Sequence, residues 1–210
     1  MDENNLQQQF DQWAATYDAD VGHGTGFPFD GYDRVLARVI ELAAIEPGMD
    51  VLELGPGTGN LTARLVATGA EVWALDFSAE MLARARAKVP AAHLAQAGLL
   101  DDYPPDFRRP FARVVSTYTF HELPLADKLA LLRRLAGDTL QPGGRIVIGD
   151  IGFPDAAARD AIHNEAAETW DDEYYWIMDE AGPALRKAGF SLEYEQQSTC
   201  GMTLVIARPS

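Results

Sequence analysis

Cysteine and long apolar runs are almost absent from this sequence. Cys200 is the single cysteine among 210 residues, which excludes a disulfide within the chain, and we expect it to be a small buried apolar residue. No apolar run approaches the roughly 20 residues that a membrane helix needs. The start MDENNLQQQF does not have the basic and then apolar pattern of a secretory signal. We therefore expect a cytoplasmic protein that does not engage membranes.

Basic residues are also scarce, with 17 lysines and arginines against 32 acidic residues and a formal net charge of −15. Such a surface repels phosphate backbones and anionic lipids, so nucleic acid is disfavoured as a partner. The histidines His23, His93 and His163 are scattered along the chain. No spacing of histidine, cysteine and acidic residues resembles a metal site, and none is expected.

The opening segment is expected to be helical. Leu6, Phe10, Trp13 and Tyr17 recur at helical spacing and form one apolar stripe. The glycine-rich stretch VGHGTGFPFDGYD then breaks regular structure, and a second helix is predicted over residues 33–44.

From Met49 onward, short apolar strands alternate with helices. This alternation predicts a parallel sheet with helices on both faces. One or two helices are expected within residues 155–188, followed by an antiparallel hairpin formed by residues 190–197 and 203–209. The predicted fold is α/β: a Rossmann-like, doubly wound, mostly parallel seven-stranded sheet with a C-terminal antiparallel hairpin and N-terminal helices. The predicted strands of the parallel part are 49–54, 71–76, 92–97, 112–117 and 144–150, and the helices between them are 61–69, 78–88 and 125–138.

The strongest motif is the turn Glu53-Leu54-Gly55-Pro56-Gly57-Thr58-Gly59-Asn60. Glycines at a strand-to-helix turn allow the backbone to approach a ligand closely. Asp76 ends the next predicted strand, where a carboxylate can hold ribose hydroxyls. Together these features predict an adenosine-type ligand.

The spacing of the glycines distinguishes between such ligands. A dinucleotide fingerprint G-x-G-x-x-G would place its third glycine at Asn60, one residue after Gly59. Glu53 would sit badly beside a pyrophosphate but suits the ammonium group of a methionine moiety. A P-loop needs a lysine, and none occurs between residues 1 and 87.

Five segments make the chain resemble the class I S-adenosylmethionine (SAM)-dependent methyltransferases. They are ELGPGTG, LDFSAEML, VVSTYTFHELP, LQPGGRIVIGD and the opening FDQWAATYD. STYTFHEL is also similar to the YrrT-like methyltransferases. The resemblance implies one domain over residues 1–210, with a helical lid at 1–45, a SAM-binding core at 46–150, and helices with the hairpin at 151–210. It further implies SAM as cofactor, S-adenosylhomocysteine (SAH) as product, and a small-molecule methyl acceptor.

The resemblance also assigns cofactor-binding residues. Members of the family often carry an acid after the third strand, where this chain has Ala97-Gly98-Leu99. Asp101 or Asp102 can substitute, or the backbone N–H groups of Leu99 and Leu100 can serve. The predicted cofactor-binding residues are Tyr17, Glu53, Gly55, Pro56, Gly57, Thr58, Gly59, Asp76, Phe77, Ser78, Met81, Gly98, Leu99, Leu100 and Ser116.

Methyl transfer needs a catalytic base only when the acceptor is protonated. His121 is the first candidate for a base because histidine titrates near neutral pH, and Tyr118 can line the same mouth. The run Trp170–Trp176 could hold a cationic amine, but an amphipathic helix with an acidic outer face is the favoured interpretation. A non-catalytic SAM-binding or SAH-binding protein and a nicotinamide-dependent oxidoreductase remain as alternatives.

Overall fold

The computed structural model describes residues 3–22 and 26–207. His23 lies outside the described residues, as do the two positions after it. In the part of the chain that is described, no helix has the length and apolar character needed to cross a bilayer.

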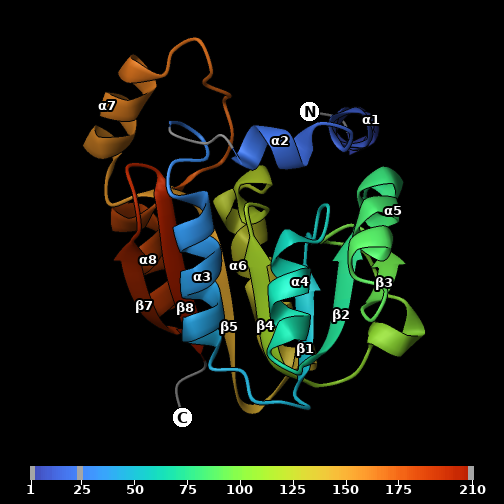
Figure 1. Cartoon of the computed structure of the whole chain (residues 1–210). Coiled ribbons are helices and arrows are strands. Elements are labelled where there is room, and N and C mark those ends of the chain that lie inside the picture. The colour runs from blue at the N-terminus through green and yellow to red at the C-terminus, as the bar shows by residue number, and fades with distance from the viewer. Residues whose placement is uncertain (1–2, 23–25, 208–210) are drawn as a thin grey trace.

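One sheet organises the fold (Figure 1). Its strand order is β3-β2-β1-β4-β5-β8-β7. The first five strands are parallel to one another, and β8 runs antiparallel to both of its neighbours, β5 and β7. These seven strands confirm the predicted fold, whereas the short β6, which pairs with the end of β5, was not predicted. The strands are β1 Asp50–Leu54, β2 Glu71–Asp76, β3 His93–Gln96, β4 Phe111–Thr117, β5 Leu140–Phe153, β6 Trp176–Ile177, β7 Ser191–Gln196 and β8 Gly201–Ala207.

Helices cover both faces of this sheet. In Figure 1, α3 and α4 lie in front of the sheet, with α6 and α8 behind it, while α1 and α2 lie above the ends of the strands. The helices are α1 Glu3–Trp13, α2 Tyr17–Gly22, α3 Tyr32–Ala43, α4 Asn60–Ala67, α5 Ala79–Lys88, α6 Leu125–Arg134, α7 Ala156–Glu165 and α8 Met178–Lys187. Short helical turns occupy Pro105–Phe107, Phe120–Glu122 and Leu135–Thr139.

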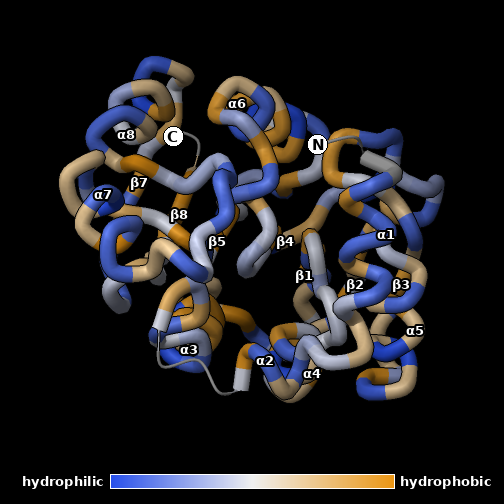
Figure 2. Tube along the Cα trace, turned by 90° about the horizontal axis from the view of Figure 1, so that it is seen from above, coloured by the Kyte–Doolittle hydropathy of each residue, from blue (hydrophilic) through white to orange (hydrophobic). Residues whose placement is uncertain are grey.

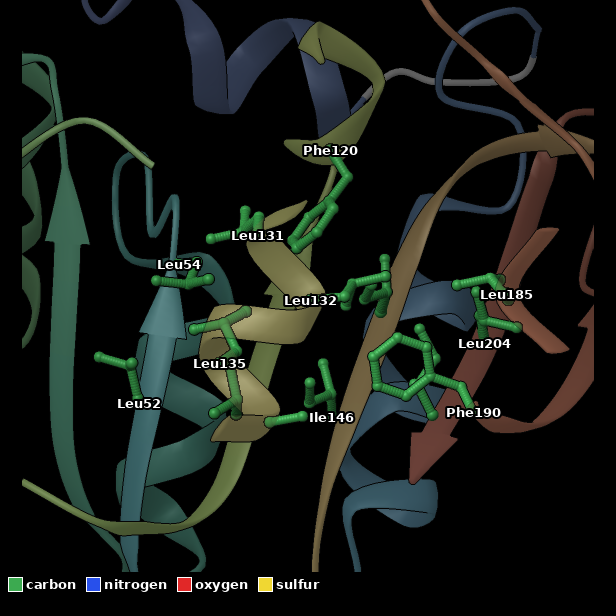
Figure 3. Close-up of a cluster of buried hydrophobic side chains, with 14 of the residues drawn as sticks. Leu52, Leu54, Phe120, Leu131, Leu132, Leu135, Ile146, Leu185, Phe190 and Leu204 are labelled. Carbon is green, nitrogen blue, oxygen red and sulfur yellow. The ribbon is translucent and has the colours of Figure 1, made fainter. Parts of the chain in front are cut away.

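Two apolar clusters, one on each face, hold the layers together. Strand β1 contributes to both, because Leu52 and Leu54 pack toward α6 while Val51 packs toward α3 and α4. Figure 3 shows the first cluster, in which Leu131 and Leu132 of α6 pack with Leu52 and Leu54 of β1. A strand that is buried on both faces consists mostly of apolar residues. Residues 49–54 were therefore recognisable as a strand from the sequence. Cys200 is fully buried, as expected.

Two local predictions need correction. The opening stripe does not form one helix, because the chain breaks between Trp13 and Tyr17 into α1 and α2. The Trp13 Nε1–H and the Thr16 hydroxyl both donate to one oxygen of Asp20, at 2.7 and 2.9 Å, which stabilises the break.

The run Trp170–Trp176 is not a helix, and that interpretation was wrong. The segment has no regular secondary structure, and only its last residue enters β6. Tyr175 packs into the cluster on the α3 side, whereas Trp176 packs into the cluster on the α6 side. Successive side chains that point to opposite sides require an extended backbone.

Candidate active site

The carboxyl ends of the parallel strands bring the predicted site residues together. Figure 2 looks down on this edge, with the ends of β1, β4 and β5 near the centre and α2 beside α4. Ligands of open α/β sheets bind outside these strand ends. The glycine turn follows β1, Asp76 ends β2, and Tyr118 follows β4.

The glycine turn between β1 and α4 is shaped for close approach. Gly55 has a φ of 69°, and a Cβ there would lie 2.2 Å from the Thr119 hydroxyl oxygen, so only glycine fits. Gly57 has a φ of 54°, but a Cβ at this position would meet nothing within 4 Å. The backbone at Gly57 therefore faces open space that a ligand can occupy.

Glu53 is fully buried beneath this turn. Its Oε2 accepts a hydrogen bond from the Thr62 hydroxyl at 2.7 Å, whereas its Oε1 is buried and has no hydrogen-bond partner among residues 3–22 and 26–207. Burial raises the pKa of Glu53 to about 8, and the nearby charge of Asp76 adds to the rise, although the Thr62 hydrogen bond opposes it. An unpartnered buried carboxyl oxygen is costly unless a ligand satisfies it, and the ammonium group of SAM has the right chemistry.

Asp76 links β2 to the glycine turn. Its Oδ2 accepts from the Gly57 amide at 3.0 Å and its Oδ1 accepts from the Ser78 amide at 2.9 Å. The residue is only 5% exposed, and this burial raises its pKa to about 6 even though the backbone amides favour the carboxylate. A carboxylate fixed by two amides at this position fits the ribose hydroxyls of an adenosine.

The start of α5 completes this side of the site. Ser78 is the N-cap, as predicted, since its hydroxyl oxygen accepts from the Met81 amide at 3.1 Å. The same hydroxyl donates to Asp11 of α1 at 2.5 Å. The Phe77 ring meets the Phe10 ring edge-on at 5.3 Å, so α1 covers the start of α5.

Asp101, one of the two acids expected to substitute in adenine recognition, shapes the loop after β3. Asp101 Oδ2 accepts from the Gly98 amide at 2.7 Å and closes the turn. Arg134 of α6 holds the same loop from below, because its guanidinium donates to the carbonyls of Leu99, Leu100 and Asp101. Leu100 is 43% exposed at the outer side of this loop.

Helix α2 is bonded directly to the glycine turn. Asp18 accepts from the Thr58 hydroxyl at 2.5 Å, from the Asn60 amide at 3.1 Å and from Lys88 of α5 at 2.8 Å. Tyr17, at the start of this helix, meets Trp13 and Phe29 edge-on, with ring centroids 4.8 and 6.5 Å away. With the N-terminal helices in this position, Glu53 and Asp76 are both buried.

The end of β4 carries the second unusual polar group. Ser116 ties β4 to β1, because its hydroxyl donates to the Leu54 carbonyl at 2.7 Å. Tyr118 has a φ of 50°, a conformation that is strained for a residue with a side chain. Its ring lies 5.0 Å from the Tyr32 ring, and its buried hydroxyl has no hydrogen-bond partner. Burial raises the pKa of Tyr118 well above its ordinary value, so the hydroxyl keeps its proton.

His121 lies in a setting that the sequence did not reveal. Its Nδ1 is 2.5 Å from Oδ1 of the fully buried Asp150, while Nε2 lies 3.8 Å from Glu122 Oε1 and 3.7 Å from Glu173 Oε2. Burial lowers the pKa of His121, but Asp150, Glu173 and Glu122 outweigh it and raise the pKa to about 9. Asp150 was missed, although it ends the predicted strand 144–150 as Asp76 ends β2; β5 itself continues to Phe153. Glu122 and Glu173 had no sequence signal beyond their charge.

The fold matches solved methyltransferases over almost its whole length. The DhpI–SAM–HEP complex superposes with a TM-score of 0.73, 24% sequence identity, and coverage of 99% of this chain and 97% of that one. Magnesium protoporphyrin IX methyltransferase from Synechocystis PCC 6803 with bound SAH gives a TM-score of 0.73 at 16% identity, covering 99% and 100%. This is the fold of the class I SAM-dependent methyltransferases.

The sequence comparisons specify the family. A methyltransferase-domain family matches residues 51–144. An uncharacterised methyltransferase of Geobacillus kaustophilus is 36% identical over 200 residues, covering 90% of each chain. The uncharacterised methyltransferase YrrT of Bacillus subtilis is 31% identical over 201 residues, covering 90% of this chain and 91% of its own. The chain belongs to this family of methyltransferases; it is a SAM-dependent methyltransferase, and SAM is its cofactor.

Proposed function

We propose that the enzyme transfers a methyl group from SAM to a small-molecule nucleophile bound beside Tyr118 and His121. One observation carries the proposal. Two buried side-chain oxygens in the described part of the chain have no hydrogen-bond partner, Glu53 Oε1 and Tyr118 Oη. Buried polar groups are normally satisfied, so these two mark places where ligands complete the site. Glu53 lies on the cofactor side and Tyr118 faces the acceptor side.

The cofactor-binding set proposed from the sequence fits this picture. Glu53 holds the ammonium group, Asp76 the ribose, and the backbone of the glycine turn the methionine portion. Phe77 and Met81 flank the adenine, and the loop Gly98–Leu100 contacts its edge. SAM supplies a methyl group that is already activated, so the protein mainly has to position the acceptor and exclude water.

Aromatic side chains gather at the proposed acceptor side. Phe27 stacks on Trp170 at 4.7 Å between ring centroids, and Tyr175 meets Phe27 and Phe153 edge-on. A neighbouring hollow of about 240 Å³ is lined by Trp170, Glu173 and Tyr175 among others. A hollow of this size suits a small molecule, and the net charge of −15 disfavours nucleic acid.

Two structural neighbours support the same class of acceptor by name. One is the magnesium protoporphyrin IX methyltransferase, and another is phosphoethanolamine N-methyltransferase 2 of Haemonchus contortus, which has a TM-score of 0.69 at 16% identity. Both names specify small molecules. We further propose that His121 lies beside the acceptor, where its pKa of about 9 makes it a hydrogen-bond donor near neutral pH and a base only at higher pH, and that the enzyme works in the cytoplasm as one domain.

The test is a calorimetric titration with SAM, SAH and NAD, followed by a screen for SAH production over amines, thiols, phenols, carboxylic acids and RNA. We expect micromolar binding of SAM and SAH, no binding of NAD, and turnover on one class of small molecule. Turnover on RNA but on no small molecule would overturn the proposal.

A further inference from the structure

Three potential metal ligands converge behind the acceptor side. His121 Nε2, one carboxylate oxygen of Glu122 and one of Glu173 all lie within 4.8 Å of one another. Nε2 lies 3.8 Å from Glu122 Oε1 and 3.7 Å from Glu173 Oε2, and the His121 side chain is only 8% exposed. An imidazole nitrogen of a nearly buried side chain beside two carboxylates has the chemistry of a ligand set.

The other nitrogen of His121 is held as in a metal site. Its Nδ1 meets Asp150 Oδ1 at 2.5 Å, and Asp150 is itself fixed by the Ile151 amide at 2.9 Å and by Trp176 Nε1 at 3.0 Å. Metal-binding histidines typically bond a carboxylate through the nitrogen that does not bind the metal, and this bond fixes the tautomer and ring orientation.

The segment that carries Glu173 is also fixed beside His121. The amide of Tyr174 donates to the His121 carbonyl at 2.9 Å, and Lys128 donates to the Tyr174 carbonyl. Glu173 therefore cannot drift far from the imidazole. Its side chain is 26% exposed and lines the hollow of about 240 Å³, which provides a route for an ion from solvent.

We propose that His121, Glu122 and Glu173 bind one divalent transition-metal ion of the Zn²⁺ class at the acceptor side of the active site. One imidazole and two carboxylates suit such ions, whereas Mg²⁺ and Ca²⁺ prefer oxygen ligands alone. Ligands of a tetrahedral Zn²⁺ lie roughly 3.3 Å apart, as follows from its usual bond lengths. The two separations from Nε2 are 3.7 and 3.8 Å and the three ligand atoms all lie within 4.8 Å of one another, so the carboxylates have to rotate inward to close the set around an ion.

Three protein ligands leave a coordination position open, as in catalytic rather than structural zinc sites. That position suits an oxygen or sulfur atom of the acceptor. This role depends on the proposed function, but metal binding itself does not. With a metal bound, Nε2 is a ligand and not a base, so the ion would replace His121 in activating the acceptor.

The test measures Zn²⁺ binding to the full chain, stripped with a chelator and without SAM, in competition with a chromogenic chelator. One Zn²⁺ per chain is expected, with binding at least 10-fold weaker in His121→Ala and in Glu173→Gln. Mg²⁺ at the same concentration should not compete. The matched controls are His93→Ala and Glu165→Gln, whose side chains are exposed and lie outside the cluster, and both should bind as the parent protein does.

Folding of each variant is checked by its thermal unfolding. If His121→Ala fails to fold, Glu122→Gln and Glu173→Gln provide the same test with smaller changes in shape. Absence of stoichiometric binding in the parent protein, or equal binding in Glu122→Gln and Glu173→Gln, would overturn the metal site. A loss confined to His93→Ala would show adventitious surface binding and would overturn it too. SAM binding is measured on the same samples, so a failed metal site leaves the methyltransferase assignment standing.

Discussion

The Thr62 hydroxyl donates to Glu53 Oε2 at 2.7 Å, and this single bond is all that the described structure gives the buried carboxyl group. Thr62 lies in the first turn of α4. The helix that follows the glycine turn therefore also holds Glu53, which precedes that turn. One oxygen is thereby oriented while the other remains for a ligand. Burial with incomplete bonding is also why the pKa of Glu53 is raised to about 8.

Glu53→Gln is expected to stabilise the protein without cofactor at alkaline pH. The folded state holds the Glu53 proton more tightly than the unfolded chain does, because the pKa rises from 4.5 to about 8 on folding. The contribution of Glu53 to stability is therefore fully present below pH 4.5, falls as the pH rises, and is lost above about 8. The variant should exceed the parent by on the order of 5 kcal/mol at pH 9 and match it near pH 4.5.

Urea unfolding at a series of pH values measures this difference. Glu193→Gln, an exposed change of the same kind on β7, is the control and should follow the parent protein. A parallel pH dependence in Glu53→Gln and the parent would contradict the raised pKa.

Asp76→Asn and Glu53→Gln should weaken binding of different parts of the cofactor. Adenosine has the ribose of SAM but no ammonium group. We expect Asp76→Asn to weaken SAM, SAH and adenosine alike, by about 1–3 kcal/mol or roughly 5–150-fold. Glu53→Gln should weaken SAM and SAH but leave adenosine unchanged. Calorimetric titration with the three ligands measures both effects. Weaker adenosine binding in Glu53→Gln alone would reverse the two assignments.

The cofactor side was predictable from sequence because its determinants are local. The glycine turn directly follows β1, and Asp76 ends the adjacent strand, so strand-turn-helix alternation is enough to place them together. Ser78 at the start of α5 was recognisable for the same reason. These residues need only the order of the elements along the chain and not the packing of distant segments.

The acceptor side could not be predicted in this way. Asp150 lies 29 residues after His121, and Glu173 comes from a segment between α7 and α8 that was expected to be helical. The position of Glu173 depends on Tyr175 and Trp176 entering opposite apolar clusters. This placement arises from tertiary packing and not from the local sequence. Similarly, the break between α1 and α2 depends on the hydrogen bonds of Asp20, which the apolar stripe does not indicate.

Asp18→Ala should loosen the N-terminal lid and speed cofactor release. Asp18 bonds Thr58, Asn60 and Lys88, and both carboxylates of the cofactor site are buried with α2 in place. The Asp18–Lys88 pair is partly exposed, so we expect a loss of about 1 kcal/mol and a roughly fivefold faster dissociation of SAM. Stopped-flow displacement of SAM by excess SAH measures this rate. Asp33→Ala, which breaks an exposed pair with Arg64, is the control and should not change it.

The substitution Tyr118→Phe removes the hydroxyl but keeps the ring, so it tests the hydroxyl independently of the ring contacts. The phenylalanine ring can keep the contacts with Phe29 and Tyr32, so the free energy of unfolding should be unchanged or higher by up to about 1 kcal/mol, since an unpartnered buried hydroxyl is removed. SAM affinity should also be unchanged if the hydroxyl faces the acceptor, as we propose.

Methyl transfer to the acceptor found in the screen should fall about 10-fold in kcat/KM, the size of one hydrogen bond made in the transition state. Thermal unfolding and SAH production measured on the same preparation separate stability from turnover. Tyr174→Phe is the matched control, because the Tyr174 side chain is 54% exposed. Equal kcat/KM in Tyr118→Phe and the parent would exclude the hydroxyl from the reaction and leave its strained backbone at φ 50° without a catalytic reason.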